Sequence, residues 1–212
     1  MLSDMGIEQV DRLIDVTFPT LEGWCSEQKA KRMARLVADT PSSRPPLCVE
    51  LGVFGGRGVI AMGLAVKHVL AGQGRVDGID PYTAAASLEG TNDAANQAWW
   101  SQVDYQKIYS SAMKGILDLG LGEIVHLIVR RSQDMVGDYA KQSIDVLHQD
   151  SNHSEEVSCY EVATWTPRVR PGGYWVFDDI NWPSTKKAQA SLAAHGYTLL
   201  ETHDTWAVYR AP

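Results

Sequence analysis

The fold is decided by one stretch of sequence, Leu47 to Gly58, which reads LCVELGVFGGRG. Its first five residues are mostly apolar and predict a short buried strand, and the glycines that follow predict a tight turn. From Gly58 to Leu70, small and apolar residues without proline predict a helix packed on a sheet, and residues 75–80 predict a second strand. A strand, a helix and a second strand in this order form the first unit of a parallel sheet.

The same alternation continues along the chain. Further strands are expected at residues 124–129, 144–148 and 174–177, and residues 197–201 and 206–209 read as a hairpin that closes one sheet edge. We therefore predict an α/β fold, a Rossmann-like, doubly wound and mostly parallel seven-stranded sheet with a C-terminal antiparallel hairpin. Residues 1–46 are expected to be a helical cover that starts with a polar lead-in, and residues 47–212 the main part of a single domain.

Composition narrows the class of protein. The 212 residues are 44% hydrophobic and 21% charged, which is typical of a globular chain. A net charge of -7 argues against a nucleic-acid partner, because phosphate backbones need clustered Lys and Arg. The three cysteines, Cys25, Cys48 and Cys159, are widely spaced and favour a reducing cytoplasm over a disulfide framework. No signal sequence or membrane span is expected, and the sequence leaves a homo-oligomer open.

The glycine-rich turn carries the first functional signal. Glu50 precedes its first glycine, where it would repel a diphosphate, and the pattern is not the dinucleotide motif GxGxxG. A zwitterionic ligand without phosphate suits this turn better, although the glycines could serve strand-to-helix packing alone. Asp80 ends the second strand and could accept both hydroxyls of a ribose, or merely open a turn with Pro81. Together these residues predict an adenosine site.

A second signal is a set of carboxylates after two strands expected to be neighbours. Asp150 follows one strand, and Asp178 and Asp179 follow the next. Unpaired carboxylates ~4 Å apart repel by roughly 4 kcal/mol at an effective dielectric near 20, so a positive charge is expected between them. Three carboxylates suit Mg²⁺ or another hard divalent ion. The alternative is that some of them cap helices or turns.

His153 stands three residues after Asp150 in an expected loop, and imidazole accepts protons near neutral pH. We expect His153, together with Asp150, to carry catalysis, whereas the alternative is a solvated loop histidine. Between Asp80 and Gly115 lies an aromatic-rich stretch that either covers a substrate or fills core. Trp24 could likewise line the site or pack on the N-terminal helix.

The ordered motifs Glu50-Leu51-Gly52, Asp80-Pro81, Asp150-Ser151-Asn152-His153, Pro171-Gly172-Gly173 and Asp178-Asp179 resemble the class I methyltransferases, which use S-adenosylmethionine. They are similar in particular to the macrocin and mycinamicin branch of metal-dependent sugar O-methyltransferases. Asn152 departs from the common pattern, which has a second acid there. The resemblance makes residues 47–212 a methyltransferase domain. It implies a cofactor site of Glu50, Gly52, Gly55, Asp80, Ser132, Gln133 and Asp150, with Ser132 and Gln133 near the adenine. It also implies a metal site of Asp150, Asp178 and Asp179, and His153 as the base.

The function expected from these residues is methyl transfer from S-adenosylmethionine to a hydroxyl of a small molecule, of sugar or natural-product type. Mg²⁺ would lower the pKa of the hydroxyl while His153 removes the proton. One alternative is an NAD-dependent oxidoreductase, which the position of Glu50 disfavours. Another is a non-catalytic protein that only binds S-adenosylmethionine, because a fold does not guarantee chemistry.

Overall fold

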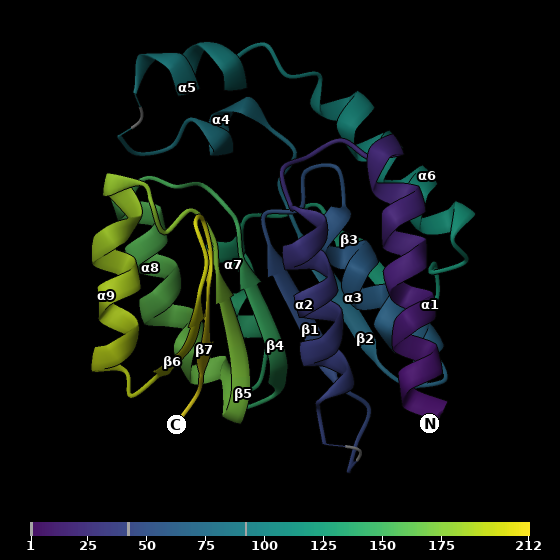
Figure 1. Cartoon of the computed structure of the whole chain (residues 1–212). Coiled ribbons are helices and arrows are strands. Elements are labelled where there is room, and N and C mark those ends of the chain that lie inside the picture. Colours follow the sequence, from purple (N-terminus) through teal and green to yellow (C-terminus); the bar gives the residue numbers. More distant parts are fainter. Residues whose placement is uncertain (1, 42, 92) are drawn as a thin grey trace.

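A central sheet with helices on both faces organises the chain in the computed structural model, which describes residues 2–41, 43–91 and 93–212 (Figure 1). Its seven strands lie in the order β3-β2-β1-β4-β5-β7-β6, with β1 to β5 parallel and β7 antiparallel to both neighbours. The predicted sheet and its C-terminal hairpin are therefore confirmed. The strands are β1 Leu47–Leu51, β2 Arg75–Ile79, β3 Val125–Ile128, β4 Ile144–Gln149, β5 Val169–Phe177, β6 Thr198–Thr202 and β7 Ala207–Arg210.

Two helical layers cover the sheet. Helices α1, α2, α3 and α6 share one hydrophobic cluster with one face, and α7, α8 and α9 share a second cluster with the other. The side chains of β1 alternate accordingly, with Cys48 in the first cluster and Val49 and Leu51 in the second. The helices are α1 Leu2–Thr17, α2 Glu27–Ala38, α3 Arg57–His68, α4 Ala84–Ser87, α5 Ala94–Trp100, α6 Tyr105–Asp118, α7 Ser132–Met135, α8 Glu155–Trp165 and α9 Lys186–Ala194.

The expected polar lead-in is wrong, because residues 2–17 form helix α1. This helix packs on α2 and α3 through the buried side chains of Val10 and Ile14, and Phe18 follows four residues later, just after the helix ends. Packing rather than intrinsic propensity therefore stabilises α1. Ser26 caps the start of α2, since its hydroxyl accepts a hydrogen bond from the backbone N–H of Lys29 at 3.2 Å. The division of the chain at residue 46 stays a prediction.

The segment with α4 and α5 lies beyond the carboxyl ends of the parallel strands, at the top of Figure 1. Ligand sites of open α/β sheets lie at this edge, so the segment is well placed to cover one. Among residues 2–41, 43–91 and 93–212, no helix combines the length and hydropathy needed to cross a bilayer.

Close contact between the ends of β1 and β4 depends on Gly52. Its φ is +81°, and a Cβ there would lie 2.1 Å from the carbonyl oxygen of Asp150. The backbone N–H of Gly52 donates to Ile79 at 2.9 Å, and that of Asp150 donates to Leu51 at 2.8 Å. Gly52 thus holds three strand ends within one small region.

We predict that Gly52→Ala lowers the free energy of unfolding by about 3 kcal/mol or more, because it adds a backbone clash to the strain of a positive φ. Gly72 is the matched control: its φ is +77°, and no described heavy atom lies within 4 Å of a Cβ placed there. Gly72→Ala should cost only about 1 kcal/mol. Urea denaturation of both variants measures the difference, and equal costs would contradict the role given to the contact at Gly52.

Candidate active site

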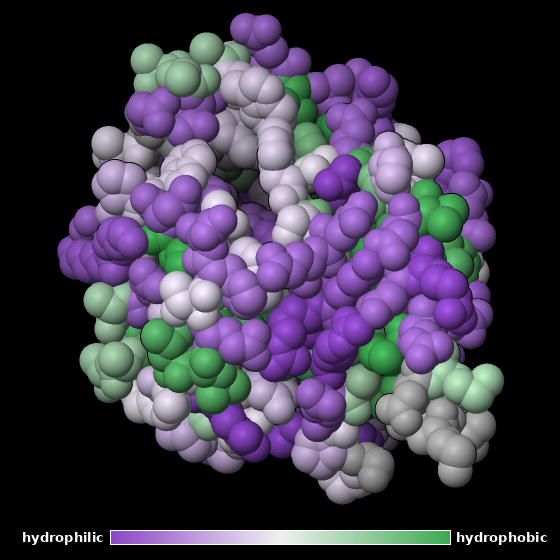
Figure 2. Space-filling model, in the orientation of Figure 1, coloured by the Kyte–Doolittle hydropathy of each residue, from purple (hydrophilic) through white to green (hydrophobic). Residues whose placement is uncertain are grey.

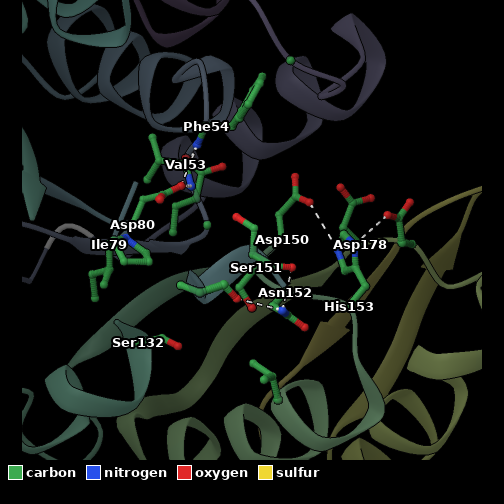
Figure 3. A pocket seen from close by; sticks show the side chains of 18 of the residues that line it. Val53, Phe54, Ile79, Asp80, Ser132, Asp150, Ser151, Asn152, His153 and Asp178 are labelled. Atoms are coloured by element: carbon green, nitrogen blue, oxygen red, sulfur yellow. Dashed lines mark hydrogen bonds and ion pairs between the residues drawn. The ribbon is translucent and has the colours of Figure 1, made fainter. Parts of the chain in front are cut away.

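A pocket of about 520 Å³ opens at the carboxyl ends of the parallel strands. Its walls come from the turn after β1, the end of β2, the α4–α5 segment and the loops after β4 and β5. Figure 2 shows an opening in this face of the molecule, below the α4–α5 segment. In Figure 3, Asp80 lies near Val53 and Phe54 on one side, and His153 lies near Asp178 on the other. The volume suits a small-molecule ligand.

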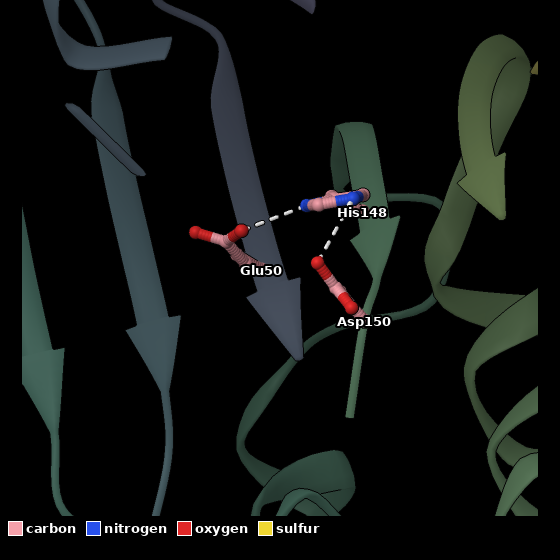
Figure 4. Close-up of side chains that lie close together, drawn as sticks. All are labelled: Glu50, His148 and Asp150. Carbon is pink, nitrogen blue, oxygen red and sulfur yellow. Dashed lines mark hydrogen bonds and ion pairs between the residues drawn. The ribbon is translucent and has the colours of Figure 1, made fainter. Parts of the chain in front are cut away.

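Glu50 is a buried carboxylate of the pocket wall, with 2% of its surface exposed. One oxygen, Oε1, lies 2.7 Å from Nδ1 of the buried His148, as Figure 4 shows. The other oxygen, Oε2, has no hydrogen-bond partner among the described residues. Burial raises the pKa of Glu50, while His148 opposes that rise. An unpaired carboxylate oxygen beside a pocket suits a cationic or hydrogen-bonding group of a ligand.

Asp80 fastens the glycine-rich turn to the end of β2. Its Oδ2 accepts hydrogen bonds from the backbone of Val53 at 2.9 Å and of Phe54 at 3.0 Å, and its Oδ1 accepts one from Tyr82 at 2.7 Å. Burial raises the pKa of Asp80, although these three hydrogen bonds work against the rise. The turn-forming role is therefore present. The carboxylate also lines the pocket, and the ribose contact stays a prediction.

The structure brings the three predicted metal ligands near each other, with two nitrogen-bearing side chains among them. Nζ of Lys29, a residue only 2% exposed, forms an ion pair with Oδ2 of Asp178 and lies 3.5 Å from Oδ2 of Asp150. The imidazole of His153 lies between Asp150 and the third carboxylate, Asp179. Its Nε2 is 3.6 Å from Oδ1 of Asp150, and its Nδ1 is 3.2 Å from Oδ2 of Asp179.

This arrangement does not gather the three aspartates around one point. In the described part of the chain, the three side chains close enough to share an ion are Glu50, His148 and Asp150. Two of these already form a direct hydrogen bond with each other. The predicted set of Asp150, Asp178 and Asp179 would have to rearrange before its oxygens could surround Mg²⁺ at ~2.1 Å. The metal site therefore stays a prediction.

The charges of the cluster are strongly coupled. Burial favours the neutral form of Asp150, but Lys29 and His153 hold its pKa below the usual range. Burial likewise favours neutral His153, yet the neighbouring aspartates outweigh it and raise the pKa of the imidazole. Burial raises the pKa of Asp179 to about 6. Among the described residues Nε2 of His153 has no hydrogen-bond partner, and the carboxylate oxygen Oδ1 of Asp150 lies 3.6 Å from it.

A buried carboxylate that the sequence did not reveal, Glu161, supports the pocket wall that contains Ser132 and Ser151. Glu161 on α8 accepts hydrogen bonds from Ser132 at 2.5 Å, Ser151 at 2.6 Å and Gln149 at 3.0 Å. The Ser132 hydroxyl therefore points to Glu161, and the contact of Ser132 and Gln133 with adenine stays a prediction. Glu161 stands four residues before Trp165 on the buried face of its helix, and this position was the available signal.

The contacts of Asn152 show why an amide, and not an acid, fits at this position. Its amide nitrogen donates toward the carbonyl oxygens of Ala86, Ser87 and Glu89 at 2.9, 3.0 and 2.9 Å. Its own oxygen accepts the backbone N–H of Ser154 at 2.8 Å. A carboxylate would face three carbonyl oxygens and be repelled, so the amide is what ties the α4 segment over the pocket.

Four aromatic rings form a wall at the pocket: Trp24, Phe54, Trp99 and Trp100. Trp24 stacks on Phe54 with ring centroids 5.2 Å apart and meets the edge of Trp99 at 4.8 Å. Trp24 is 66% exposed and Trp99 is 43% exposed, so neither fills core. Each of the two alternatives for this stretch holds in part, since Trp99 and Trp100 line the pocket while Tyr82 lies in the core and Tyr109 packs against it.

The fold and this site define an α/β protein with a small-molecule pocket at the carboxyl edge of its parallel strands. Residues 49–180 match the family model described as a methyltransferase domain, and the chain belongs to that family. The prediction of a methyltransferase is confirmed. The macrocin-type branch stays a prediction, and a search of curated proteins finds no match.

Solved structures agree on the fold. The O-methyltransferase NovP superposes with a TM-score of 0.71 at 14% identity, covering 99% of each chain. An O-methyltransferase from Bacillus cereus in complex with SAH gives 0.59 at 15% identity, covering 98% of this chain and 91% of that one. TomG from Streptomyces achromogenes, an O-methyltransferase of tomaymycin synthesis in complex with SAM, gives 0.59 at 15% identity, covering 97% and 89%.

We predict that Asn152→Asp loosens the α4 segment, because three carbonyl oxygens would then face a negative charge. Backbone amides of residues 84–91 should exchange hydrogen about tenfold faster or more, as expected for the loss of about 1.4 kcal/mol or more of local stability. Gln102→Glu, at an exposed position between α5 and α6, is the control and should leave that exchange unchanged. Unchanged exchange in Asn152→Asp would show that the tether does not hold the segment.

Proposed function

We propose that this protein transfers a methyl group from S-adenosylmethionine to a hydroxyl of a small molecule, of sugar or natural-product type. One observation carries the proposal. One pocket is lined both by Glu50, whose Oε2 is unpaired, and by His153, whose Nε2 is unpaired, within the described residues. The first suits a cationic donor, and the second suits an acceptor that must lose a proton.

The pocket residues around Glu50 fit S-adenosylmethionine. The unpaired Oε2 of Glu50 is a natural partner for its ammonium group. Gly52 and Gly55 keep the turn in close contact with neighbouring backbone at the pocket, since a Cβ on Gly55 would lie 2.1 Å from the carbonyl oxygen of Glu22. Asp80 would hold the ribose, while Ser132 and Gln133 line the far wall where the adenine would lie. The SAH and SAM complexes of two similar folds support this assignment.

When bound, S-adenosylmethionine supplies an activated methyl group, whose S–C bond breaks as an O–C bond forms and S-adenosylhomocysteine is released. The protein has to bring the acceptor oxygen into line and take up its proton. His153 does the second, with Nε2 receiving the proton while Nδ1 faces Asp179. Asp150, 3.6 Å from Nε2, favours the imidazolium that results.

The aromatic wall supports an acceptor with a flat or apolar body. The Trp24, Phe54, Trp99 and Trp100 rings would pack on such a body and leave its hydroxyl to reach His153. NovP and TomG, whose folds are similar, are O-methyltransferases, which supports oxygen as the methylated atom. We also place the reaction in the cytoplasm, because the three cysteines are free thiols, as a reducing compartment requires.

Neither alternative fits as well. A dinucleotide would bring its diphosphate close to the carboxylates of Glu50 and Asp80, while the Arg57 guanidinium of this turn is occupied by the carbonyl oxygens of Phe18 and Leu21. A protein that only binds S-adenosylmethionine has no need of a pocket histidine, His153, held between two carboxylates.

The test combines binding and turnover. Isothermal titration calorimetry should show one-to-one binding of S-adenosylmethionine and no binding of NAD. Mass spectrometry over a panel of phenols, sugars and hydroxylated polyketides should then find one class that gains a methyl group on oxygen. Binding of NAD instead would overturn the proposal, and tight S-adenosylmethionine binding without turnover on any acceptor would favour the non-catalytic alternative.

The pH profile gives a separate prediction. A base must be neutral to accept a proton, and the aspartates around His153 raise its pKa above the ordinary value of about 6.5. The rate should therefore rise with pH through a midpoint above about 6.5. His153→Gln should lose this rising limb and at least about 100-fold in kcat, while S-adenosylmethionine binding persists. A rising limb that survives in His153→Gln would assign the base to another residue.

A further inference from the structure

We propose that Lys29 takes the place of a divalent ion beside Asp150 and Asp178, so that this methyltransferase works without a metal. The inference rests on the proposed function for the reaction itself. Its structural part, that the ammonium group of Lys29 fills the cation position between the two carboxylates, stands independently of any substrate.

Lys29 is buried, and its ammonium group contacts both Asp150 and Asp178. The residue lies in the first turn of α2, where its backbone N–H is held by the capping Ser26, and its side chain is 3% exposed. A lysine is almost never so buried without a partner. Nζ has two, since it forms an ion pair with Oδ2 of Asp178 and lies 3.5 Å from Oδ2 of Asp150. The ammonium thus occupies the space between the two strand ends.

The third carboxylate of the predicted metal set, Asp179, also faces a nitrogen of this chain. His153 lies between Asp150 and Asp179, with contacts of 3.6 and 3.2 Å. Each carboxylate of the predicted metal set therefore already faces a nitrogen of this chain. Mg²⁺ demands near-octahedral oxygen ligands at ~2.1 Å, so it could bind between Asp150 and Asp178 only after Lys29 had moved away. An ammonium left nearby would also repel the ion.

The position of Lys29 relative to the pocket defines what it does. Asp150 and Asp178 line the pocket, whereas Lys29 is not among the described residues that do. Lys29 therefore acts through the two aspartates as a positioning residue. It keeps the two carboxylates together at the ends of β4 and β5, with Asp150 beside His153.

The neighbouring group of Glu50, His148 and Asp150 does not offer a better metal site. Nδ1 of His148 lies 2.7 Å from Oε1 of Glu50, which is a direct hydrogen bond and leaves no room for an ion between these atoms. The distance from Nε2 of His148 to Oδ2 of Asp150 is 3.8 Å. That oxygen of Asp150 is the one that faces Lys29.

Titration with Mn²⁺, followed by electron paramagnetic resonance, tests the structural part on the whole unliganded protein. The wild type should not bind Mn²⁺ at this site, whereas Lys29→Ala should open it and bind one ion. That ion should raise the Tm of Lys29→Ala by about 5 °C or more at saturation, with no shift in the wild type. Lys31→Ala is the matched control, because Lys31 lies on the same helix and pairs with Asp15 instead.

A second variant guards against a failure of Lys29→Ala to fold. The double variant Lys29→Ala/Asp178→Asn removes a charge of each sign and should fold, and it should not bind Mn²⁺. One-to-one Mn²⁺ binding by the wild type that is lost in Asp178→Asn would overturn the proposal. The wild-type titration decides this even if Lys29→Ala does not fold.

The catalytic part has its own measurement. Wild-type protein treated with EDTA should keep its full rate of methyl transfer, and added Mg²⁺ should not raise it. Loss of turnover in EDTA that Mg²⁺ restores would overturn the metal-free reaction while leaving the proposed methyl transfer intact. Absence of S-adenosylmethionine binding would sink the proposed function, and the Mn²⁺ titrations would still test Lys29.

Discussion

Repulsion between two carboxylates at adjoining strand ends is the constraint on which the rest of the site depends. Asp150 and Asp178 follow β4 and β5, which are paired in parallel up to Gln149 and Phe177. Left unpaired at ~4 Å, two such charges repel by about 4 kcal/mol at an effective dielectric near 20. Lys29 removes this penalty from the side of α2. The N-terminal helical cover is therefore part of the site's electrostatics as well as a packing layer.

Buried polar groups hold the other walls of the pocket in the same way. Asp80 binds the backbone of the glycine-rich turn, Glu161 collects hydroxyls from α7 and from the loop after β4, and Asn152 ties down the α4 segment. Each group is satisfied by donors or acceptors from elements distant in sequence. Such supports fix the pocket walls before any ligand arrives, which is what precise alignment of a methyl donor and an acceptor requires.

The sequence was sufficient to predict the sheet, because each strand is a short apolar run that ends in a turn signal, as at Leu51 and Gly52. It did not lead to the prediction of α1, although Ile7, Val10 and Ile14 recur at helical spacing among the charged residues of that segment. It also failed for Lys29, which stands 121 residues from Asp150. A periodicity analysis assigns a lysine on an amphipathic helix to solvent. Only the topology, which brings α2 over the ends of β4 and β5, shows that this one is buried.

A lysine in place of an ion changes how an acceptor can be held. A divalent ion binds the substrate oxygen directly and favours acceptors with two neighbouring hydroxyls, whereas a buried ammonium behind Asp150 and Asp178 offers no open coordination position. Orientation must then come from the groups that do face the pocket. These are Nε2 of His153, which can bind a single hydroxyl, and the aromatic wall, which can hold the body that carries it. The metal-free arrangement therefore shifts acceptor selection from chelation to the fit of a flat or apolar surface against Trp24 and its neighbours.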